Sequence, residues 1–169
     1  IPPLALDGPL LSIRRFAVKA LTMQDFIAFN TISEPMALVL QGVVKARLNR
    51  VSADEAAFYG ANLQGALLRE ALLERAHFED ADLQLADLSG ASLLDGYFYG
   101  ANLSKATLTD ADLAGTDLRR TNLRQANLRR ANLQGALLDS ATLDGASLVE
   151  ADLESAYLDD ASLVRADLH

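Results

Sequence analysis

The sequence predicts an all-β solenoid, a rod built from short repeated turns of chain, and three observations lead to this fold class. From Ala56 to Leu168 the chain runs in five-residue units without an insertion. The third position of these units is Leu in twenty of the twenty-three units and Phe in the other three. The first position is Ala in all but three units, so each unit combines one large apolar side chain with one small residue.

A period of five fits neither the 3.6-residue period of an α-helix nor the two-residue period of a flat strand. The pattern is satisfied when each unit forms one short side of a coil, with Leu and the small residue facing inward and a turn at the corner. The other three positions then face outward. Seven of the eight glycines in this region occupy the fifth position, where a corner calls for a positive φ or a close backbone approach.

The repeated run resembles the pentapeptide-repeat family, whose pattern is Ala-(Asp/Asn)-Leu-x-x, in units such as Ala61–Gly65 and Ala126–Arg130. The resemblance covers about two-thirds of the chain. It implies a right-handed quadrilateral β-helix with four units, or twenty residues, per coil. Phe58, Phe78 and Phe98 support this number independently, because their spacing of twenty would stack them as a ladder down one side.

The chain divides into two segments with different sequence patterns. Residues 1–45 are predicted to be a mostly helical N-terminal capping or docking segment, and residues 46–169 the repeat region. Apolar residues at helical spacing follow an extended start, and a sequence like a capping box at Thr22–Asp25 would begin a second short helix. We expect this segment to cover the open end of the first coil; the alternative is an arm that docks onto another protein.

The two ends of the chain raise further expectations. The chain begins with Ile1 rather than Met, which a removed targeting signal and an incomplete chain would explain equally well. It stops at His169 inside a unit, without a cap. Either further residues or another subunit would then cover the open C-terminal coil, and some members of the family that the chain resembles dimerise through this end. A homo-oligomer is therefore one expected partnership.

Grouping the units by twenty places all four tyrosines of the chain at outward positions on the side of the Phe ladder. Tyrosine is favoured at interfaces because it offers a large rigid contact area with one polar tip. We therefore predict a partner-binding surface here; the alternative is that the rings pack over one another and stiffen the rod. The residues of this predicted surface are Tyr59, Tyr97, Tyr99, Tyr157 and Leu137, with His77 on the same side.

Arginine is concentrated in one coil, on three of its four sides, whereas residues 136–169 hold eight acidic residues and one base. Such a charge pattern is typical of a solvated surface; the alternative is electrostatic steering of a partner with complementary charge. The arginines of this girdle, which we add to the predicted partner-binding set, are Arg119, Arg120, Arg124, Arg129 and Arg130.

Composition and spacing argue against catalysis and against several binding functions. The chain has no Cys, and its two histidines lie at opposite ends of the repeat region, so we predict no metal site. No serine has a histidine nearby, carboxylates at the second position are typical of solvated or turn-bonding groups, and a leucine-filled rod has no cleft. We therefore predict no enzyme activity and no cofactor. A net charge of −8 argues against binding nucleic acid. The sequence contains no run of eighteen apolar residues, so we predict no membrane span.

These observations favour a non-enzymatic structural or scaffolding protein that binds a partner protein through the Tyr-rich side, the N-terminal segment or the open C-terminal coil. The regular units are similar to pentapeptide proteins of cyanobacteria and plastids, several of them lumenal. This implies a photosynthetic assembly at the thylakoid, with the cytoplasm as the alternative location. The alternative function is a DNA mimic that inhibits or protects DNA gyrase, as some family members do. The net charge fits a DNA mimic, but the arginine girdle would interrupt an acidic track.

Overall fold

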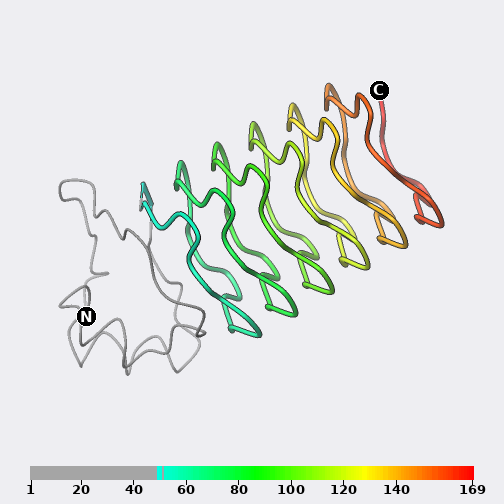
Figure 1. Ribbon diagram of the computed structural model, residues 1–169. Helices are drawn as coiled ribbons and strands as arrows, with labels where there is room; N and C mark the ends of the chain where they lie inside the picture. Colours follow the sequence, from blue (N-terminus) through cyan, green and yellow to red (C-terminus); the bar gives the residue numbers. More distant parts are fainter. Residues whose placement is uncertain (1–48, 51) are drawn as a thin grey trace, which may run out of the picture.

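The computed structural model describes residues 49–50 and 52–169, which form a rod of stacked coils running from residue 52 to the C-terminus (Figure 1). The expectations for residues 1–45 concern residues outside this described part. Within it, no helix is long and apolar enough to cross a membrane.

Parallel bridges join each second-position residue to the residue twenty positions further along the chain, from Ser52↔Leu72 to Ser147↔Asp167. A turn closes each five-residue unit, so one coil has four units and four walls. The predicted twenty-residue coil is therefore confirmed. The all-β prediction needs one correction, because the described residues contain isolated bridges and no longer strand. Each wall is too short to pair more than one residue before the chain turns.

Backbone hydrogen bonds connect every inner coil to both of its neighbours. The third amide of a unit donates to the next coil, as when Phe78 N donates to Tyr97 O at 2.7 Å. The second amide donates to the preceding coil, as when His77 N donates to Ala56 O at 2.8 Å. The fifth amide also donates to the next coil, and the first amide closes the preceding turn. One bridge per wall is thus supported by several hydrogen bonds around it.

Every corner uses a left-handed backbone residue. All described fifth positions, from Arg50 to Arg165, have φ between 53° and 71°. Only seven of these residues are glycines, and seventeen carry a side chain, including Leu85. The prediction of a positive φ at the glycine corners is confirmed but was too narrow. The four-residue turn requires a positive φ at its third residue, so all the corners adopt it whatever residue is present.

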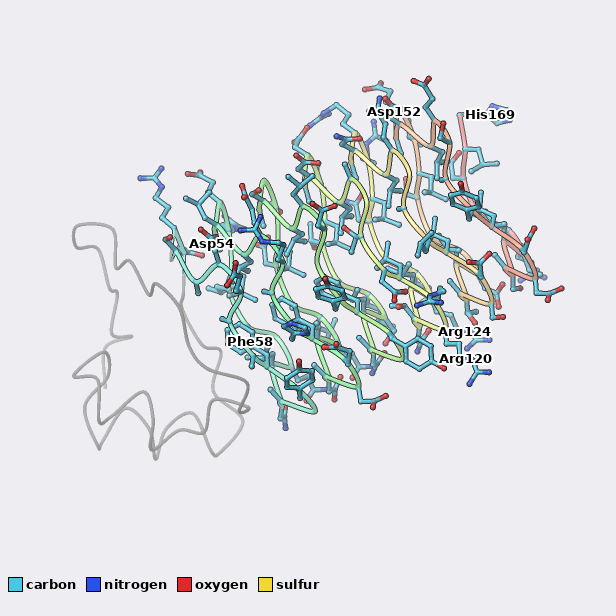
Figure 2. The ribbon with its side chains drawn as sticks, in the orientation of Figure 1. Asp54, Phe58, Arg120, Arg124, Asp152 and His169 are labelled. Carbon is cyan, nitrogen blue, oxygen red and sulfur yellow. The ribbon has the colours of Figure 1, made fainter. Side chains whose placement is uncertain are left out.

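The interior is a column of leucine and phenylalanine lined by alanine. Third-position side chains from Leu68 to Leu143 are at most 1% exposed. The rings of Phe58, Phe78 and Phe98 stack with centroid distances of 4.8 and 4.7 Å, which confirms the predicted ladder; Phe58 lies at the start of the stack in Figure 2.

Two threonines and one glycine interrupt the alanine column for local reasons. Thr116 Oγ1 donates to Leu93 O at 3.2 Å, and Thr121 Oγ1 donates to Phe98 O at 2.8 Å. A Cβ at Gly96 would lie only 2.9 Å from Leu93 O and 3.1 Å from the Phe98 ring. The interior therefore contains two satisfied hydroxyl groups and one position without room for alanine.

The last coil of the rod is less buried than the inner ones. Leu153, Leu158 and Leu163 are only partly buried, and Leu168 is 54% exposed. These leucines occupy the same repeat position as the fully buried ones, and the structure describes no coil beyond them that covers their outer side.

Candidate partner-binding surface

Aspartate and asparagine at the second position hold the corners of the rod. All eleven of these residues in the described part accept a hydrogen bond from the amide two residues later, as when Arg124 N donates to Asn122 Oδ1 at 3.2 Å. This amide has no backbone partner in the repeat, so the side chain satisfies it locally. The turn-bonding interpretation of these residues is therefore confirmed.

Four units without Asp or Asn at the second position satisfy the same amide in another way. The acceptor is then an Asp or Asn at the fourth position of the preceding coil, twenty residues earlier. Asp54, labelled in Figure 2, is one of these. The four pairs are Arg69 N with Asn49 Oδ1, Glu74 N with Asp54 Oδ1, Asp159 N with Asp139 Oδ1 and Val164 N with Asp144 Oδ1.

The outward positions form four walls, which we number in chain order from the wall that contains Phe58. The units centred on Phe58, Leu63, Leu68 and Leu73 begin the first, second, third and fourth walls, and each wall continues every twenty residues. The second and fourth walls lie on opposite sides of the coil, and the fourth wall adjoins the first.

Charge differs strongly between these opposite walls. The fourth wall carries seven carboxylates and one arginine, whereas the second carries two carboxylates and three cations. The carboxylates of the fourth wall are Asp54, Glu55, Glu74, Asp95, Asp112, Asp152 and Glu154. The cations of the second wall are Lys105, Arg124 and Arg165, and they border a shallow groove of about 470 Å³. Sequence reasoning followed charge along the chain and missed this contrast, because residues of one wall recur only every twenty positions.

The tyrosines predicted to bind a partner lie on the first wall, and three of them are close together. Tyr59, Tyr97 and Tyr99 are 42%, 39% and 38% exposed. Tyr59 and His77 have a centroid distance of 5.0 Å, and His77 stacks on Tyr97 at 4.5 Å with planes 9° apart. Tyr59 and Tyr97 thus pack against His77, as the alternative of stacked rings expected, while all three tyrosines stay about two-fifths exposed. Partner binding at this surface stays a prediction.

The other two predicted residues of this wall lie further along the rod. Tyr157 is 58% exposed and bridges to Leu137, which is partly buried. Asp117 separates Leu137 from Tyr97 in the second-position column. The structure therefore does not join Tyr157 and Leu137 to the three clustered tyrosines.

The predicted arginine girdle is largely engaged within the chain. Its ion pairs are Arg119–Asp117 at 2.7 Å, Arg124–Asp144 at 3.3 Å and Arg130–Asp110 at 2.6 Å. Arg120 and Arg129 form no ion pair with a described residue; Arg120 and Arg124 are labelled in Figure 2. The girdle is a set of separate sites rather than one free basic belt.

The girdle meets the tyrosine cluster at Tyr99. The guanidinium carbons of Arg119 and Arg120 lie over this ring at 5.9 and 5.7 Å from its centroid. These distances are within the range of a cation–π interaction. The structure thus brings together two predicted groups, the arginines and the tyrosines, at one position of the first wall.

The ion pairs shift the pKa values of their carboxyl groups. A hydrogen bond from Arg119 holds the pKa of Asp117 below its ordinary value, although partial burial works in the opposite direction. A hydrogen bond from Arg130 likewise lowers the pKa of Asp110. The Ser162 hydroxyl is the main cause of the lowered pKa of Asp144, with smaller contributions from Val164 N and Arg124.

A histidine–carboxylate pair lies among the clustered tyrosines and was missed by the sequence analysis. His77 Nδ1 and Glu79 Oε1 are 3.0 Å apart. The other oxygen, Glu79 Oε2, is buried and has no hydrogen-bond partner among the described residues. Burial, followed by the charge of Glu79, raises the pKa of Tyr59. Nothing in the five-residue pattern distinguishes Glu79 from other outward acidic residues.

The described residues include no group of three or more side chains that could hold a metal ion. The second histidine, His169, lies at the far end of the rod from His77. The chemical groups that this part of the chain offers a partner are aromatic rings, ion pairs and exposed charges.

Comparison with known proteins gives consistent matches. A family model for pentapeptide repeats matches in eight copies, over residues 56–93, 97–135, 106–145 and 136–169. A pentapeptide repeat protein from the Arabidopsis thaliana thylakoid lumen is 34% identical, with a TM-score of 0.59 over 61% of this chain and 72% of that one. HetL, a pentapeptide repeat protein involved in heterocyst differentiation regulation in the cyanobacterium Nostoc, is 29% identical over 73% and 77% of the two chains, with a TM-score of 0.40.

A more distant match is QnrB1, a plasmid-mediated fluoroquinolone resistance protein, with 20% identity and a TM-score of 0.29 over 74% of this chain and 76% of that one. None of the curated proteins compared with the chain matches it significantly. The structural neighbours imply a right-handed β-helix, the handedness that the repeat pattern suggested by resemblance.

Proposed function

Because the chain belongs to the pentapeptide repeat family, we propose that it is a non-enzymatic scaffolding protein that binds a partner protein through its first wall. The observation that carries the proposal is that Tyr59, Tyr97 and Tyr99 are each about two-fifths exposed on the first wall, with Tyr59 and Tyr97 packed on His77. Exposed tyrosines on a rigid backbone are typical of interface hot spots, because little conformational freedom is lost on binding.

The neighbouring arginines extend this surface. Arg119 and Arg120 cover one tyrosine of the cluster, and Arg120 has no carboxylate partner among the described residues. Tyrosine and arginine are the residue types that carry most interface energy in proteins. The proposed contact therefore centres on Tyr97 and Tyr99 and includes the girdle residues beside them.

The similarity to a protein of the thylakoid lumen supports a location in that compartment and a partner in a photosynthetic assembly. The test is capture of a partner from a thylakoid lumen extract by the immobilised full chain. The combined substitution Tyr97→Ala and Tyr99→Ala is expected to lose at least nine-tenths of the captured protein, corresponding to about 1.4 kcal/mol or more. Asp152→Asn with Glu154→Gln, on the fourth wall, is the matched control.

Equal capture by the tyrosine variant and the original chain would refute the first-wall contact. Circular dichroism of each variant must match that of the original chain, so that loss of the fold does not imitate loss of binding.

Self-association through the last coil belongs to the same proposal. Leu168 is 54% exposed and the leucines beside it are partly buried, and a second copy of the chain would cover them. Sedimentation of the full chain is expected to show dimers that Leu168→Asp dissociates. A monomer at all concentrations would remove this contact from the proposal.

A DNA mimic is the second candidate, because one observation favours it. The arginine girdle was expected to interrupt an acidic track, but it spares the fourth wall, whose only cation is Arg75. Strong inhibition of gyrase supercoiling by micromolar protein, lost when Asp112, Asp152 and Glu154 are neutralised, would favour this candidate over the scaffold.

A further inference from the structure

We propose that the first wall takes an arginine side chain of the partner protein, which pairs with Glu79 Oε2 between the rings of Tyr59 and Tyr99. The inference rests on the proposed function and specifies the chemistry of the contact. It follows from the position of Glu79, its unmet hydrogen bond, and the way in which the chain already uses Tyr99.

Glu79 lies between two tyrosines in the fourth-position column of the first wall. Tyr59 is one coil before it and Tyr99 one coil after it. With coils spaced about 4.8 Å apart, the two tyrosine positions are about 10 Å apart along the rod. This separation of the backbone positions is wide enough for one planar group above the Glu79 side chain once the Tyr59 ring turns outward.

The carboxylate of Glu79 is only half satisfied. Oε1 contacts His77 Nδ1 at 3.0 Å, whereas Oε2 is buried without a partner, the sole side-chain atom in this state within the described part of the chain. Buried carboxylate oxygens normally accept a hydrogen bond, and an unmet one is destabilising. A donor brought by a ligand would recover the missing interaction.

The chain itself shows which donor suits these rings. Arg119 and Arg120 already place their guanidinium groups over Tyr99, from the side of the following coil. Glu79 precedes Tyr99 by one coil, so a partner's guanidinium would approach the same ring from the opposite side. The partner's arginine would then stack on Tyr99 in the same way as Arg119 and Arg120 of this chain do.

Arginine fits this position better than lysine or an anion. A guanidinium is planar, stacks on aromatic rings and donates two parallel hydrogen bonds to a carboxylate, whereas an ammonium group is a compact hydrated charge. An anion would be repelled by Glu79 and by the carboxylates of the adjoining fourth wall. The chemistry therefore points to an arginine-bearing segment.

Glu79 Oε2 is buried, so a neighbouring side chain must move before a ligand can reach it. Tyr59 is 42% exposed and touches His77 with tilted rather than parallel rings, so it is the less tightly packed of the two neighbouring tyrosines of His77. We expect Tyr59 to turn outward when the guanidinium enters. Because the chain has no Trp and all its tyrosines lie on the first wall, tyrosine fluorescence reports this movement directly.

The experiment titrates the full chain with a blocked peptide of three arginines separated by glycines. A matched peptide with citrulline, which has the same shape and no charge, is the ligand control. Saturable fluorescence change is expected with arginine and not with citrulline. Glu79→Gln should weaken the arginine peptide about tenfold, the loss expected for one charge-assisted hydrogen bond. Glu74→Gln, a fourth-position glutamate on the fourth wall, should leave binding unchanged.

Two results would overturn the inference: equal affinity for the two peptides, or equal binding by Glu79→Gln and the original chain. Thermal unfolding checks that both glutamine variants stay folded, and Tyr99→Leu supplies a second variant that should also weaken the arginine peptide. If the tyrosine double variant abolishes partner capture while Glu79→Gln does not, the first wall binds its partner without an arginine. That outcome rejects the inference and leaves the proposed function intact.

Discussion

The inner coils and the last coil of the rod contain the same residues at the same repeat positions, yet their burial differs. Leu118 and Leu138 are fully buried, whereas Leu158, the next residue of the same column, is partly buried. At the very end Leu168 is 54% exposed. A leucine in this fold therefore needs a coil on both sides to be fully buried, and with a coil on one side it stays only partly buried.

This comparison indicates that contacts between neighbouring coils stabilise the rod. Such a solenoid is nearly one-dimensional, with each repeat stabilised by its neighbours. Substitutions at equivalent positions should therefore have a large effect in the inner coils and a smaller effect in the last coil, and the interior-leucine, corner-hydrogen-bond and corner-glycine pairs below test this expectation.

Truncation of an interior leucine should give the largest difference. Leu118→Ala is expected to lower the free energy of unfolding by about 2–5 kcal/mol, because it leaves a cavity between two coils. Leu158→Ala, in the same column, should cost less than half as much. Urea unfolding of both variants measures the two losses. Equal losses would contradict the idea that burial comes from neighbouring coils.

Removal of a buried hydroxyl should give the next largest effect. Thr121 Oγ1 donates to Phe98 O inside the column, so Thr121→Val is expected to cost about 1–3 kcal/mol by leaving that carbonyl with fewer partners. Thr142→Val, at a partly exposed outward position, should change stability by less than about 0.5 kcal/mol. Thermal unfolding compares them, and a stabilised Thr121 variant would show that the hydroxyl is dispensable.

Loss of a corner hydrogen bond should cost about 1 kcal/mol in an inner coil, similar to loss of a helix cap. Asn122→Ala removes the acceptor for Arg124 N, and the equivalent Asp167→Ala removes the acceptor for His169 N in the last coil. The second change should have little effect on global unfolding, because the last coil opens first.

A rescue experiment checks this explanation of the corner. Ser104 occupies the fourth position one coil before Arg124. From the equivalent position, Asp54, Asp139 and Asp144 each accept a hydrogen bond from the amide twenty residues later. Adding Ser104→Asp to Asn122→Ala should restore most of the lost stability in denaturant unfolding. A double variant no more stable than Asn122→Ala would show that the geometry does not transfer between walls.

Replacement of a left-handed corner residue by glycine should give a small gain. Leu85 has a φ of 60°, a conformation that costs a residue with a Cβ roughly 1 kcal/mol. Leu85→Gly should therefore raise stability by up to about 1 kcal/mol, and Ser155→Gly in the last coil by less. Calorimetry of the two variants measures both shifts, and a destabilised Leu85→Gly would mean that this exposed side chain makes a useful contact.

The smallest expected effect is a pH dependence carried by an inner-coil ion pair. Because Arg119 holds the pKa of Asp117 below its ordinary value, the pair stabilises the folded chain above the unfolded pKa of about 3.9 and loses this contribution as pH falls through the lower folded value. Arg119→Met should therefore be less stable than the original chain at pH 7. The gap should shrink in urea titrations as the pH falls below the unfolded pKa of Asp117 and through its lower folded pKa.

The control for this ion pair lies at the end of the rod. Residues 149–169 have no ion pair within the described part of the chain, and Arg165→Met should show no such pH-dependent gap. A gap of the same size in both variants would point to general charge effects instead.

Much of the fold follows from the sequence because a five-residue period permits few arrangements. The inward leucines, the stacked Phe58, Phe78 and Phe98, and the outward tyrosines all follow from assigning one unit to each wall. The sequence analysis did not anticipate that each wall pairs through a single bridge, since a wall of five residues that includes a turn has only one residue left to bridge. The expectations for residues 1–45 lie outside the described part.

The candidate site was less predictable, because it depends on pairs of residues in adjacent coils. The exposed tyrosines and the arginine girdle could be grouped by their spacing, but the contact of Arg119 and Arg120 with Tyr99 depends on side-chain conformations. Glu79 gave no pattern at all, since the burial of its Oε2 atom depends on how neighbouring side chains pack in the folded rod. Ion pairs such as Arg130–Asp110 likewise link residues whose separation of twenty matters only once the coil is known.

The opposite charges of the second and fourth walls make the rod a transverse electric dipole. An approaching macromolecule would turn the rod about its long axis before any contact forms, since such fields extend about 10 Å into a solution of moderate salt. A positively charged surface would meet the fourth wall and the adjoining first wall. A negatively charged surface would meet the groove on the second wall, with Lys105 and Arg165. The sign of the partner's surface charge thus decides which wall of the rod faces it, and this preference should weaken as the ionic strength rises.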